Sequence, residues 1–437
     1  MRKRCQYLIA GLVSFVAMGT AQAQDAGAQV GLSLTPGLSY EDEDSRARLG
    51  FGATFDSNTR RQQFSAGFDG AFESGYDDIT DSLRAPRLTL SYGIESRATA
   101  VNASLSYRRD KISALVVDDD LSSDLLVIGT GQRADLDTRA SLTFGRDAPF
   151  GGTFDLGYRE RSYLDTVDPT LLDENTASAG LSLRFVIDRR LTATLSAQGS
   201  ETDVDAPGTD LQRVSANAGL NMAVNAALTA SLILGRTRIT ETGLLGTDTT
   251  EGGSATLSAT QDMPDGAVSG RISSDVTTAG RLTTLRIDRS LDLPRGTLNF
   301  GAGLGQLDSD DLQTLARMSW SDESPRAQYG VTVDRALAVD RDGDSAINSQ
   351  ISLSWQQELD QISSFGAGLS LRDTDRLDPG RADSRQTNLS LTYRRDLTQD
   401  WGLRTSYTHR WSSETGAADT DDYTVFLGFE RGFQWRP

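Results

Sequence analysis

Apolar and polar residues alternate along almost the whole length of this 437-residue chain. Between residues 30 and 40, for example, Val30 and Leu32 occupy one parity, whereas Gly31 and Ser33 occupy the other. Because successive side chains of a β-strand point to opposite faces of a sheet, this period of two predicts strands with one apolar and one polar face. After residue 23 no stretch shows a convincing helical period, so we expect an all-β fold.

The alternation continues to the C-terminal end of the chain. Further apolar residues at every second position are Phe64, Ala66 and Phe68; Leu88, Leu90 and Tyr92; Val214, Ala216, Ala218 and Leu220; and Tyr423, Val425, Leu427 and Phe429. The positions between them are rich in Gly, Ser, Thr, Asn and Arg. One continuous pattern of this kind predicts a single β domain.

The connections between these segments alternate between short and long. We expect tight turns at residues 58–61, 95–97, 147–152, 188–190, 225–227, 263–266, 292–296, 322–326, 360–362 and 398–400. Longer polar connections, such as residues 110–135, lie between successive turns. Transmembrane β-barrels have this asymmetry, with short periplasmic turns and longer extracellular loops. The spacing predicts an antiparallel up-and-down barrel of about 22 strands, within a range of about 16 to 22.

Soluble β folds fit the pattern less well. A sandwich buries one face of each sheet and usually needs a denser core than alternating Ala, Leu, Phe and Gly. A secreted β-solenoid needs one fixed repeat length, whereas the spacing between turns varies here. Aromatic residues such as Tyr92, Tyr158 and Trp401 fall near the ends of the expected strands, as in the aromatic girdles of membrane barrels.

The N-terminal residues have the features of a secretory signal peptide. A basic stretch, Arg2 to Arg4, precedes a short apolar run and the small-residue site Ala21-Gln22-Ala23. We therefore expect a signal peptide at residues 1–23, a short linker at 24–29 and a barrel at 30–437. The linker leaves no room for a plug domain before the first strand, so we expect none.

Charge and cysteine content exclude several classes of protein. The net charge is −18, and loss of the signal peptide would remove three of the 43 basic residues and none of the 61 acidic ones, leaving −21. Such a chain lacks the basic surface that nucleic acids require, so we expect no nucleic-acid partner. Cys5, the single cysteine, lies in the signal peptide, so disulfides cannot stabilise the mature chain.

Taken together, the signal peptide, the hairpin pattern and the aromatic final segment resemble the bacterial outer-membrane β-barrel class, including porin-like proteins. The segment from Tyr393 to Leu403 is similar to a strand–turn–strand phrase of uncharacterised proteobacterial barrels, some of them associated with exopolysaccharide systems. Members of the class commonly end in Phe, whereas this chain ends Phe433-Gln-Trp435-Arg-Pro437. The resemblance implies a location in the outer membrane, contact with its lipid and lipopolysaccharide, and insertion by the barrel assembly machinery.

Catalytic and metal sites are not expected. His409, the only histidine, shares its parity with Tyr407 and Trp411, which favours a place in the aromatic girdle. With one histidine and no mature cysteine, no transition-metal site is expected, and we expect neither a cofactor nor enzyme activity. Acidic clusters in the expected loops are interpreted as solvated tips or as weak binding sites for divalent ions beside lipopolysaccharide.

The polar parity carries a set of arginines that we take as candidate lumen or selectivity residues. They are Arg108, Arg139, Arg159, Arg161, Arg184 and Arg404. Arginine and carboxylate ladders can brace a barrel wall, and they can also set selectivity for polar or anionic solutes. The sequence leaves both interpretations open.

The long connection at residues 110–135 supplies the remaining candidates. Two apolar clusters, Leu115 to Val117 and Leu125 to Ile128, flank Asp118, Asp119, Asp120 and Asp124. These clusters would either pair in a hairpin above the membrane or fold into the lumen and direct the aspartates at lumen arginines. The second arrangement would form a constriction.

Two functions are compatible with these features. The first is a passive porin-like channel for small polar solutes, and the second is a non-enzymatic structural or exopolysaccharide-associated barrel without an open pore. An open lumen that conducts ions would distinguish the first from the second.

Overall fold

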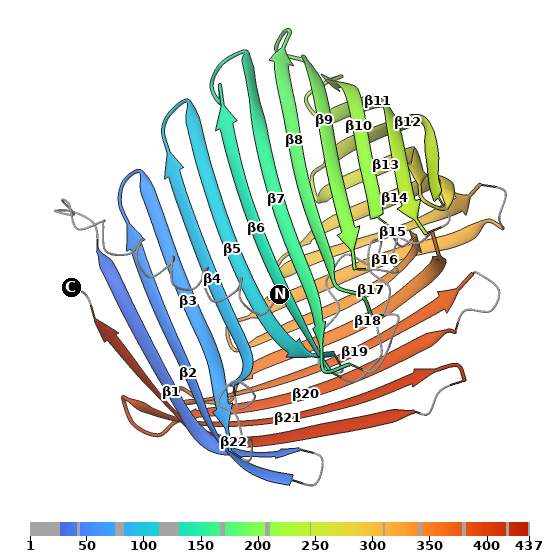
Figure 1. The fold of residues 1–437 in the computed structure, drawn as a ribbon. Coiled ribbons are helices and arrows are strands. Elements are labelled where there is room, and N and C mark those ends of the chain that lie inside the picture. The colour runs from blue at the N-terminus through green and yellow to red at the C-terminus, as the bar shows by residue number, and fades with distance from the viewer. Residues whose placement is uncertain are drawn as a thin grey trace.

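The structure, a computed structural model, describes residues 27–41, 44–74, 83–112, 131–166, 171–205, 210–244, 246–308, 311–339, 343–377, 382–416 and 419–435. They form one 22-stranded antiparallel sheet (Figure 1). The strands are β1 (Ala28–Glu41), β2 (Asp44–Asn58), β3 (Gln62–Glu73), β4 (Leu83–Glu95), β5 (Thr99–Lys111), β6 (Gln132–Phe144), β7 (Phe150–Leu164), β8 (Glu174–Val186), β9 (Leu191–Val204), β10 (Asp210–Ala223), β11 (Leu228–Gly243), β12 (Gly246–Met263), β13 (Gly266–Thr277), β14 (Gly280–Leu293), β15 (Gly296–Leu307), β16 (Gln313–Ser324), β17 (Ala327–Val339), β18 (Ser345–Glu358), β19 (Ser363–Arg376), β20 (Ser384–Asp396), β21 (Trp401–Glu414) and β22 (Thr420–Trp435).

The sheet closes on itself between its first and last strands. Each strand pairs with its neighbours in sequence, and β1 pairs with both β2 and β22, from Val30↔Trp435 to Glu41↔Thr424. Closure joins the first strand to the last, so a strand in the lipid-facing part of the wall can pair its backbone groups on both sides. The prediction of an up-and-down barrel of about 22 strands is confirmed. The described part of the chain has no helix that is long and apolar enough to span a membrane.

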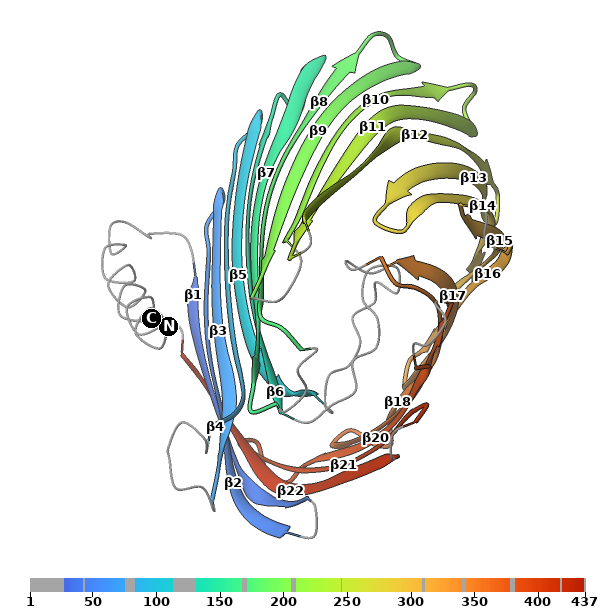
Figure 2. The same ribbon diagram turned by 45° about the vertical axis from the view of Figure 1, so that its right-hand side comes forward.

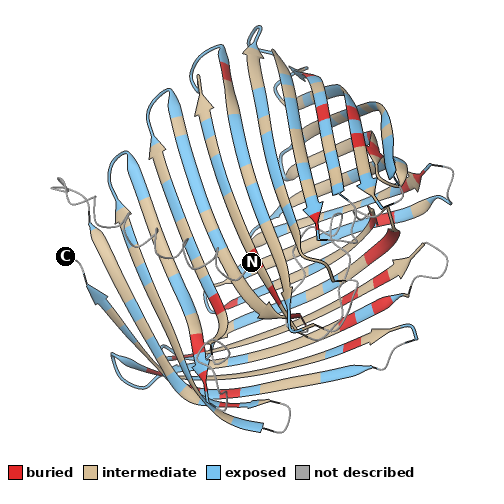
Figure 3. Cartoon of the chain, in the orientation of Figure 1, coloured by how far each residue is buried: buried red, intermediate tan, exposed pale blue. Residues whose placement is uncertain are grey.

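The two parities of each strand have the predicted environments. Leu38, Leu257 and Ile287 are more than half exposed on the outside of the barrel, whereas Ser39 on the opposite parity is buried. Figure 3 shows exposed and intermediate positions alternating along the strands. A row of exposed leucines is unfavourable in water and favourable against lipid, as a membrane barrel requires.

All ten predicted turns lie at one end of the barrel, which we call the turn end; the other is the loop end. Each predicted range overlaps one observed connection, although the strands differ by a few residues. Residues 145–149, for example, connect β6 and β7, because Phe150 already begins a strand. Short turns predict that the turn end faces the periplasm.

Seven of these turns share one hydrogen-bonding arrangement. A side-chain oxygen at the start of the turn accepts a backbone N–H two or three residues later, and the residues that supply it are Thr59, Ser96, Asp188, Asn225, Ser324, Asp360 and Thr398. This bond satisfies an amide that the sheet no longer pairs. Three turns, including the one after Ser324, have only two residues, of which the first is Pro264, Pro294 or Pro325. Proline sets the backbone angle that such a turn needs.

The expectation that every loop-end connection is long is wrong. Only residues 278–279 separate β13 from β14, and β12 begins three residues after β11 ends. In both hairpins the segments expected as loops continue as paired strands, because pairing satisfies their backbone groups. The predicted loop at residues 110–135 is shorter than expected for the same reason, since β5 extends to Lys111 and β6 begins at Gln132. The first strand likewise begins at Ala28, within the predicted linker.

The two faces of one strand allow a direct test of the membrane orientation. Leu142 faces outward, and Ser141 lines the lumen. Leu142→Arg should lower the free energy of unfolding by roughly 2–4 kcal/mol, because it places a cation in lipid, while Ser141→Arg should cost much less. Urea unfolding in lipid bilayers measures both. Equal losses would show that both faces are buried in protein.

The turn at Asp360 predicts a pH dependence. Hydrogen bonds from the Ile362 amide and from Ser363 lower the pKa of the Asp360 carboxyl. Its stabilising contribution is therefore complete above the unfolded pKa of about 3.9 and is lost as the pH falls through the lower folded value. Asp360→Asn should reduce the urea midpoint at pH 7 and leave it unchanged near pH 2. Asn225→Ala, in a turn whose acceptor is an amide, should reduce the midpoint equally at both pH values.

Candidate functional site

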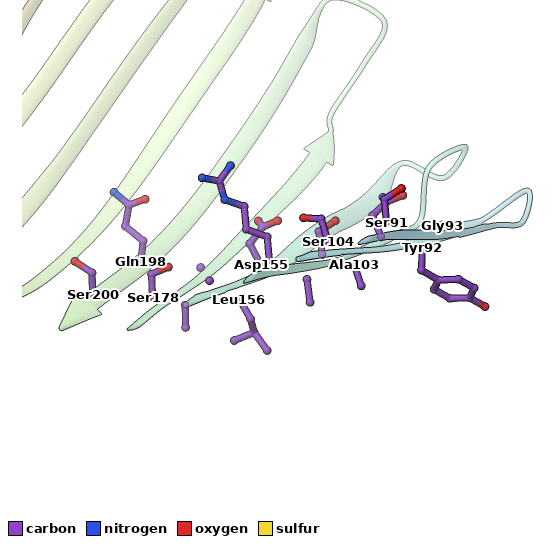
Figure 4. Close-up of a pocket in the computed structure, with 18 of the residues that line it drawn as sticks. Ser91, Tyr92, Gly93, Ala103, Ser104, Asp155, Leu156, Ser178, Gln198 and Ser200 are labelled. Carbon is purple, nitrogen blue, oxygen red and sulfur yellow. The ribbon is translucent and has the colours of Figure 1, made fainter. Parts of the chain in front are cut away.

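A polar hollow lies against the inner wall of β3 to β10. Its volume is about 740 Å³, and its lining includes Ser91, Ser104, Ser178 and Ser200. Figure 4 shows these serines, Asp155 and Gln198 on one side of the sheet, and Tyr92 and Leu156 on the other. The alternation that predicts the barrel therefore also produces a hydroxyl-rich lumen wall.

Strand register brings these side chains into rows across the wall. Ser91, Ser104, Arg139, Gly157, Ser178, Ser200 and Arg213 are successive cross-strand partners from β4 to β10. Small residues separate the two arginines, so the wall between them carries only short side chains, most of them with hydroxyl groups. A wall of this kind can hydrogen-bond a polar solute without holding it tightly.

A charged cluster stands nearer the loop end on β5 to β8. The Asp135 carboxylate accepts hydrogen bonds from the Nε atoms of Arg108, Arg133 and Arg161, at 3.1, 2.9 and 3.1 Å. Arg161 also contacts Glu174 at 3.2 Å. The Asp135 side chain is only 12% exposed. One buried carboxylate thus holds two of the predicted candidates, Arg108 and Arg161. This arrangement fits a structural role in the barrel wall.

Two other predicted arginines remain accessible to the lumen. The Nε atoms of Arg139 and Arg159 contact the same carboxylate, Asp137, at 2.9 and 3.1 Å. Their side chains are 67% and 44% exposed, so their terminal guanidinium nitrogens can still meet a solute. These two arginines suit the selectivity interpretation better than Arg108 and Arg161 do.

The last two predicted arginines have different environments. Arg184 donates to the carbonyl oxygens of residues 145, 146 and 148 and so caps the turn between β6 and β7. Arg404 lies directly opposite Arg394, which contacts Glu430 at 3.7 Å. Asp118, Asp119, Asp120 and Asp124 lie outside the described residues.

A narrowing of the lumen comes from a hairpin that sequence reasoning missed. Strand β13 pairs with β12 only as far as Ala255↔Ser274, yet it stays paired with β14 to Thr277↔Gly280. Beyond Ser274 the β13–β14 hairpin is therefore free to leave the wall. Figure 2 shows it turned toward the interior of the barrel.

The tip of this hairpin packs against the inner face of β10 and β12. Arg281 of β14 donates to the Gly253 carbonyl of β12 at 2.9 Å, and Arg213 of β10 donates to the Val276 carbonyl at 3.4 Å. A Cβ at Gly252 would come within 3.0 Å of the Val276 side chain. The missing side chain at position 252 lets the tip approach the wall this closely.

The β17–β18 hairpin behaves in the same way. Pairing between β16 and β17 ends at Ala316↔Arg335, whereas β17 and β18 stay paired to Val339↔Ser345. The freed tip forms a buried apolar cluster in which Leu337 and Ile347 pack on Leu307 and Leu315. Ala279, in the turn between β13 and β14, packs against this cluster. The two inward-folded hairpins therefore meet at the loop end, and we call this region the constriction.

The sequence does carry a signal for one of these hairpins. Residues 336–339 read Ala-Leu-Ala-Val, so both parities are apolar, and Leu337, Ala338, Ala346 and Ile347 are all buried. A strand that is apolar on both faces is covered on both faces. The break in alternation marks the position where β17 leaves the membrane wall.

His409 lies on the outer surface, as predicted, and has more partners than predicted. Its Nε2 atom contacts the Asp421 carboxylate, and its Nδ1 atom lies 3.0 Å from the Tyr407 hydroxyl. The ring also stacks on Trp411, with 3.7 Å between centroids. The group is an aromatic patch on the outer wall. Among the described residues, no three histidine, aspartate or glutamate side chains gather as metal ligands would.

Comparisons with known proteins support the architecture. No protein-family model and no curated protein matches the chain. Three solved structures are similar to it: the FrpB iron transporter (F3-3 variant) from Neisseria meningitidis (TM-score 0.60, 8% identity, 95% of this chain and 82% of that one), the ferric-catecholate import receptor Fiu from E. coli K12 (0.57, 9%, 94% and 82%) and the siderophore receptor PirA from Acinetobacter baumannii (0.54, 8%, 95% and 81%).

The fold is that of an outer-membrane β-barrel. At these identities the likeness concerns the fold alone. The three proteins are described as receptors and a transporter, and none of the three as an enzyme.

The buried carboxylate at Asp135 yields a stability prediction. Asp135→Ala should lower the free energy of unfolding by about 3 kcal/mol, because it leaves three arginines clustered without their common partner. Asp137→Ala should lower the free energy of unfolding by a smaller amount, since the side chains of Arg139 and Arg159 can turn into the aqueous lumen. Urea unfolding compares the two variants, and equal costs would mean that burial does not distinguish the two clusters.

Proposed function

We propose that this protein is an outer-membrane transport barrel that admits small polar solutes passively. The observation that carries the proposal is the hydroxyl-rich wall of β3 to β10, which leads to a constriction built from the barrel's own strands. A barrel that served only as a scaffold would have no need of a hydrated inner wall beside a narrowed mouth.

The strand number explains why a constriction is needed. Barrels of 16 to 18 strands already enclose an aqueous channel, and 22-stranded transporters hold a plug in a wider lumen. A fully open lumen of that width would admit solutes with little discrimination. The inward-folded hairpins β13–β14 and β17–β18 reduce the opening, and Arg139 and Arg159 give the polar wall a cationic component.

A second candidate function is ligand-specific uptake. The fold likeness to proteins described as a siderophore receptor and an iron transporter favours it. Iron-limited growth on ferric siderophores, with and without the gene, separates the two functions. Loss of growth on one siderophore would support uptake, and unchanged growth would support the passive pore.

The partners follow from the same proposal. Lipopolysaccharide would surround the loop end, and the barrel assembly machinery would insert the chain. The last described residues, Phe433 and Trp435, stack at 6.1 Å between centroids on β22, at the seam with β1. An aromatic pair at this seam is consistent with a C-terminal assembly signal.

Shortening the β13–β14 hairpin tests the pore directly. Replacing residues 276–281 by Asn-Gly joins Asp275 to its partner Leu282 through a two-residue turn and removes the part that reaches across the lumen. Single-channel conductance in planar bilayers should be measurable for the natural protein and larger for the shortened one.

A matched replacement in the β11–β12 hairpin serves as the control. That hairpin lengthens the wall, so replacing residues 242–247 by Asn-Gly should leave the conductance unchanged. Absence of current in both the natural and the shortened barrels would overturn the proposed function and favour a barrel without a pore.

A further inference from the structure

Two arginines lie side by side on the lumen wall at the base of the β13–β14 hairpin. Arg271 of β13 and Arg286 of β14 are direct cross-strand partners. Their neighbours Ile272 and Leu285 are exposed on the outer face, so both arginines belong to the lumen parity. They lie three residues before Ser274, where the hairpin leaves the wall. The pair therefore lines the lumen at the base of the constriction.

In the described part of the protein, no carboxylate forms an ion pair with either arginine. Within the described ranges, no carboxylate oxygen comes within 4.0 Å of either guanidinium group, in contrast to Arg139 and Arg159, which share Asp137. Like charges placed directly opposite one another weaken an antiparallel pair. The protein therefore bears a stability cost at this position, and an anion from outside would relieve it.

The surroundings of the pair define how such an anion would approach. Toward the loop end, the next lumen row holds the hydroxyl groups of Ser273 and Thr284, 2.7 Å apart. Toward the turn end, the corresponding row holds Ser269 and Asp288, whose carboxylate would repel an anion. An anion entering from the constriction thus meets hydroxyl donors first and the two guanidinium groups next.

The strands that follow β15 on the same wall add one cation and one carboxylate. Arg317 of β16 carries a further positive charge, and Asp334 of β17 lies within electrostatic reach of Arg286 and Arg317 without a contact at ion-pair distance. Asp275 stands on the hairpin itself. These charges leave the lumen nearly neutral over a wider region, so the pair acts locally, as a site for one anionic group rather than as a broad positive field.

The chemistry of the pair selects the ligand. Each guanidinium presents N–H donors in a planar fork that matches the two oxygens of a carboxylate or phosphate. We propose that Arg271 and Arg286 form an anion-binding step at the base of the constriction and that the transported solutes are small molecules bearing a carboxylate or phosphate group. This inference rests on the proposed transport function.

The test uses inorganic phosphate as the probe. Phosphate added on the loop-end side should block the single-channel current at millimolar concentration, and Arg271→Gln with Arg286→Gln should weaken that block about tenfold, since charge-assisted hydrogen bonds are lost. The double Lys variant keeps the charges and should retain most of the block. Arg236→Gln is the matched control, because Arg236 pairs with Glu251 on the outer parity.

The outcomes separate the two proposals. Equal block in the natural protein and in the double Gln variant overturns the inference and leaves the transport function standing. Absence of current overturns the transport function. Phosphate binding is then measured by urea unfolding, in which phosphate should raise the urea midpoint of the natural barrel and not that of the double Gln variant. Without phosphate, the double Gln variant should unfold at an equal or higher urea concentration, because the repulsion is gone; a lower midpoint would show that the pair is structural.

Discussion

Everything in this structure depends on the requirement that backbone polar groups be paired where water is absent. Strands β1 and β22 meet that requirement together, since their pairing from Val30↔Trp435 to Glu41↔Thr424 converts an open sheet into a closed one. In lipid, each unpaired amide or carbonyl costs several kcal/mol, so a missing seam could not be compensated by side-chain packing. Closure then divides each strand into a lipid face and a lumen face.

Most of the barrel could be predicted from the sequence because its determinants are local. Alternation along one strand is enough to assign Leu142 to lipid and Ser141 to the lumen, and a turn such as the one at Asp360 depends on a few consecutive residues. The predicted polarity of the two faces and the position of all ten turns follow from such short-range rules.

The constriction could not be predicted in the same way because it depends on where pairing stops. Whether β13 follows β12 beyond Ser274 is decided by contacts between strands that are not neighbours, such as Arg213 with Val276 and Arg281 with Gly253. The sequence instead suggested a narrowing only as one of two arrangements of the loop at residues 110–135, and residues 113–130 of that loop lie outside the described part of the chain. The role of Arg184 was missed for a related reason, since parity assigns a side chain to a face but not to its hydrogen-bond acceptors.

The proline turns have a mechanical consequence for the mouth of the barrel. Three successive turn-end connections, at Pro264, Pro294 and Pro325, are two residues long, and they join the strands from β12 to β17. A force applied at the loop end cannot shift the register of these strands, because a shift by one residue would move their outward-facing leucines from lipid to the aqueous lumen. Strands β13 to β17 are therefore held in fixed register at the turn end, and we expect deformation to occur in the hairpin tips that form the constriction.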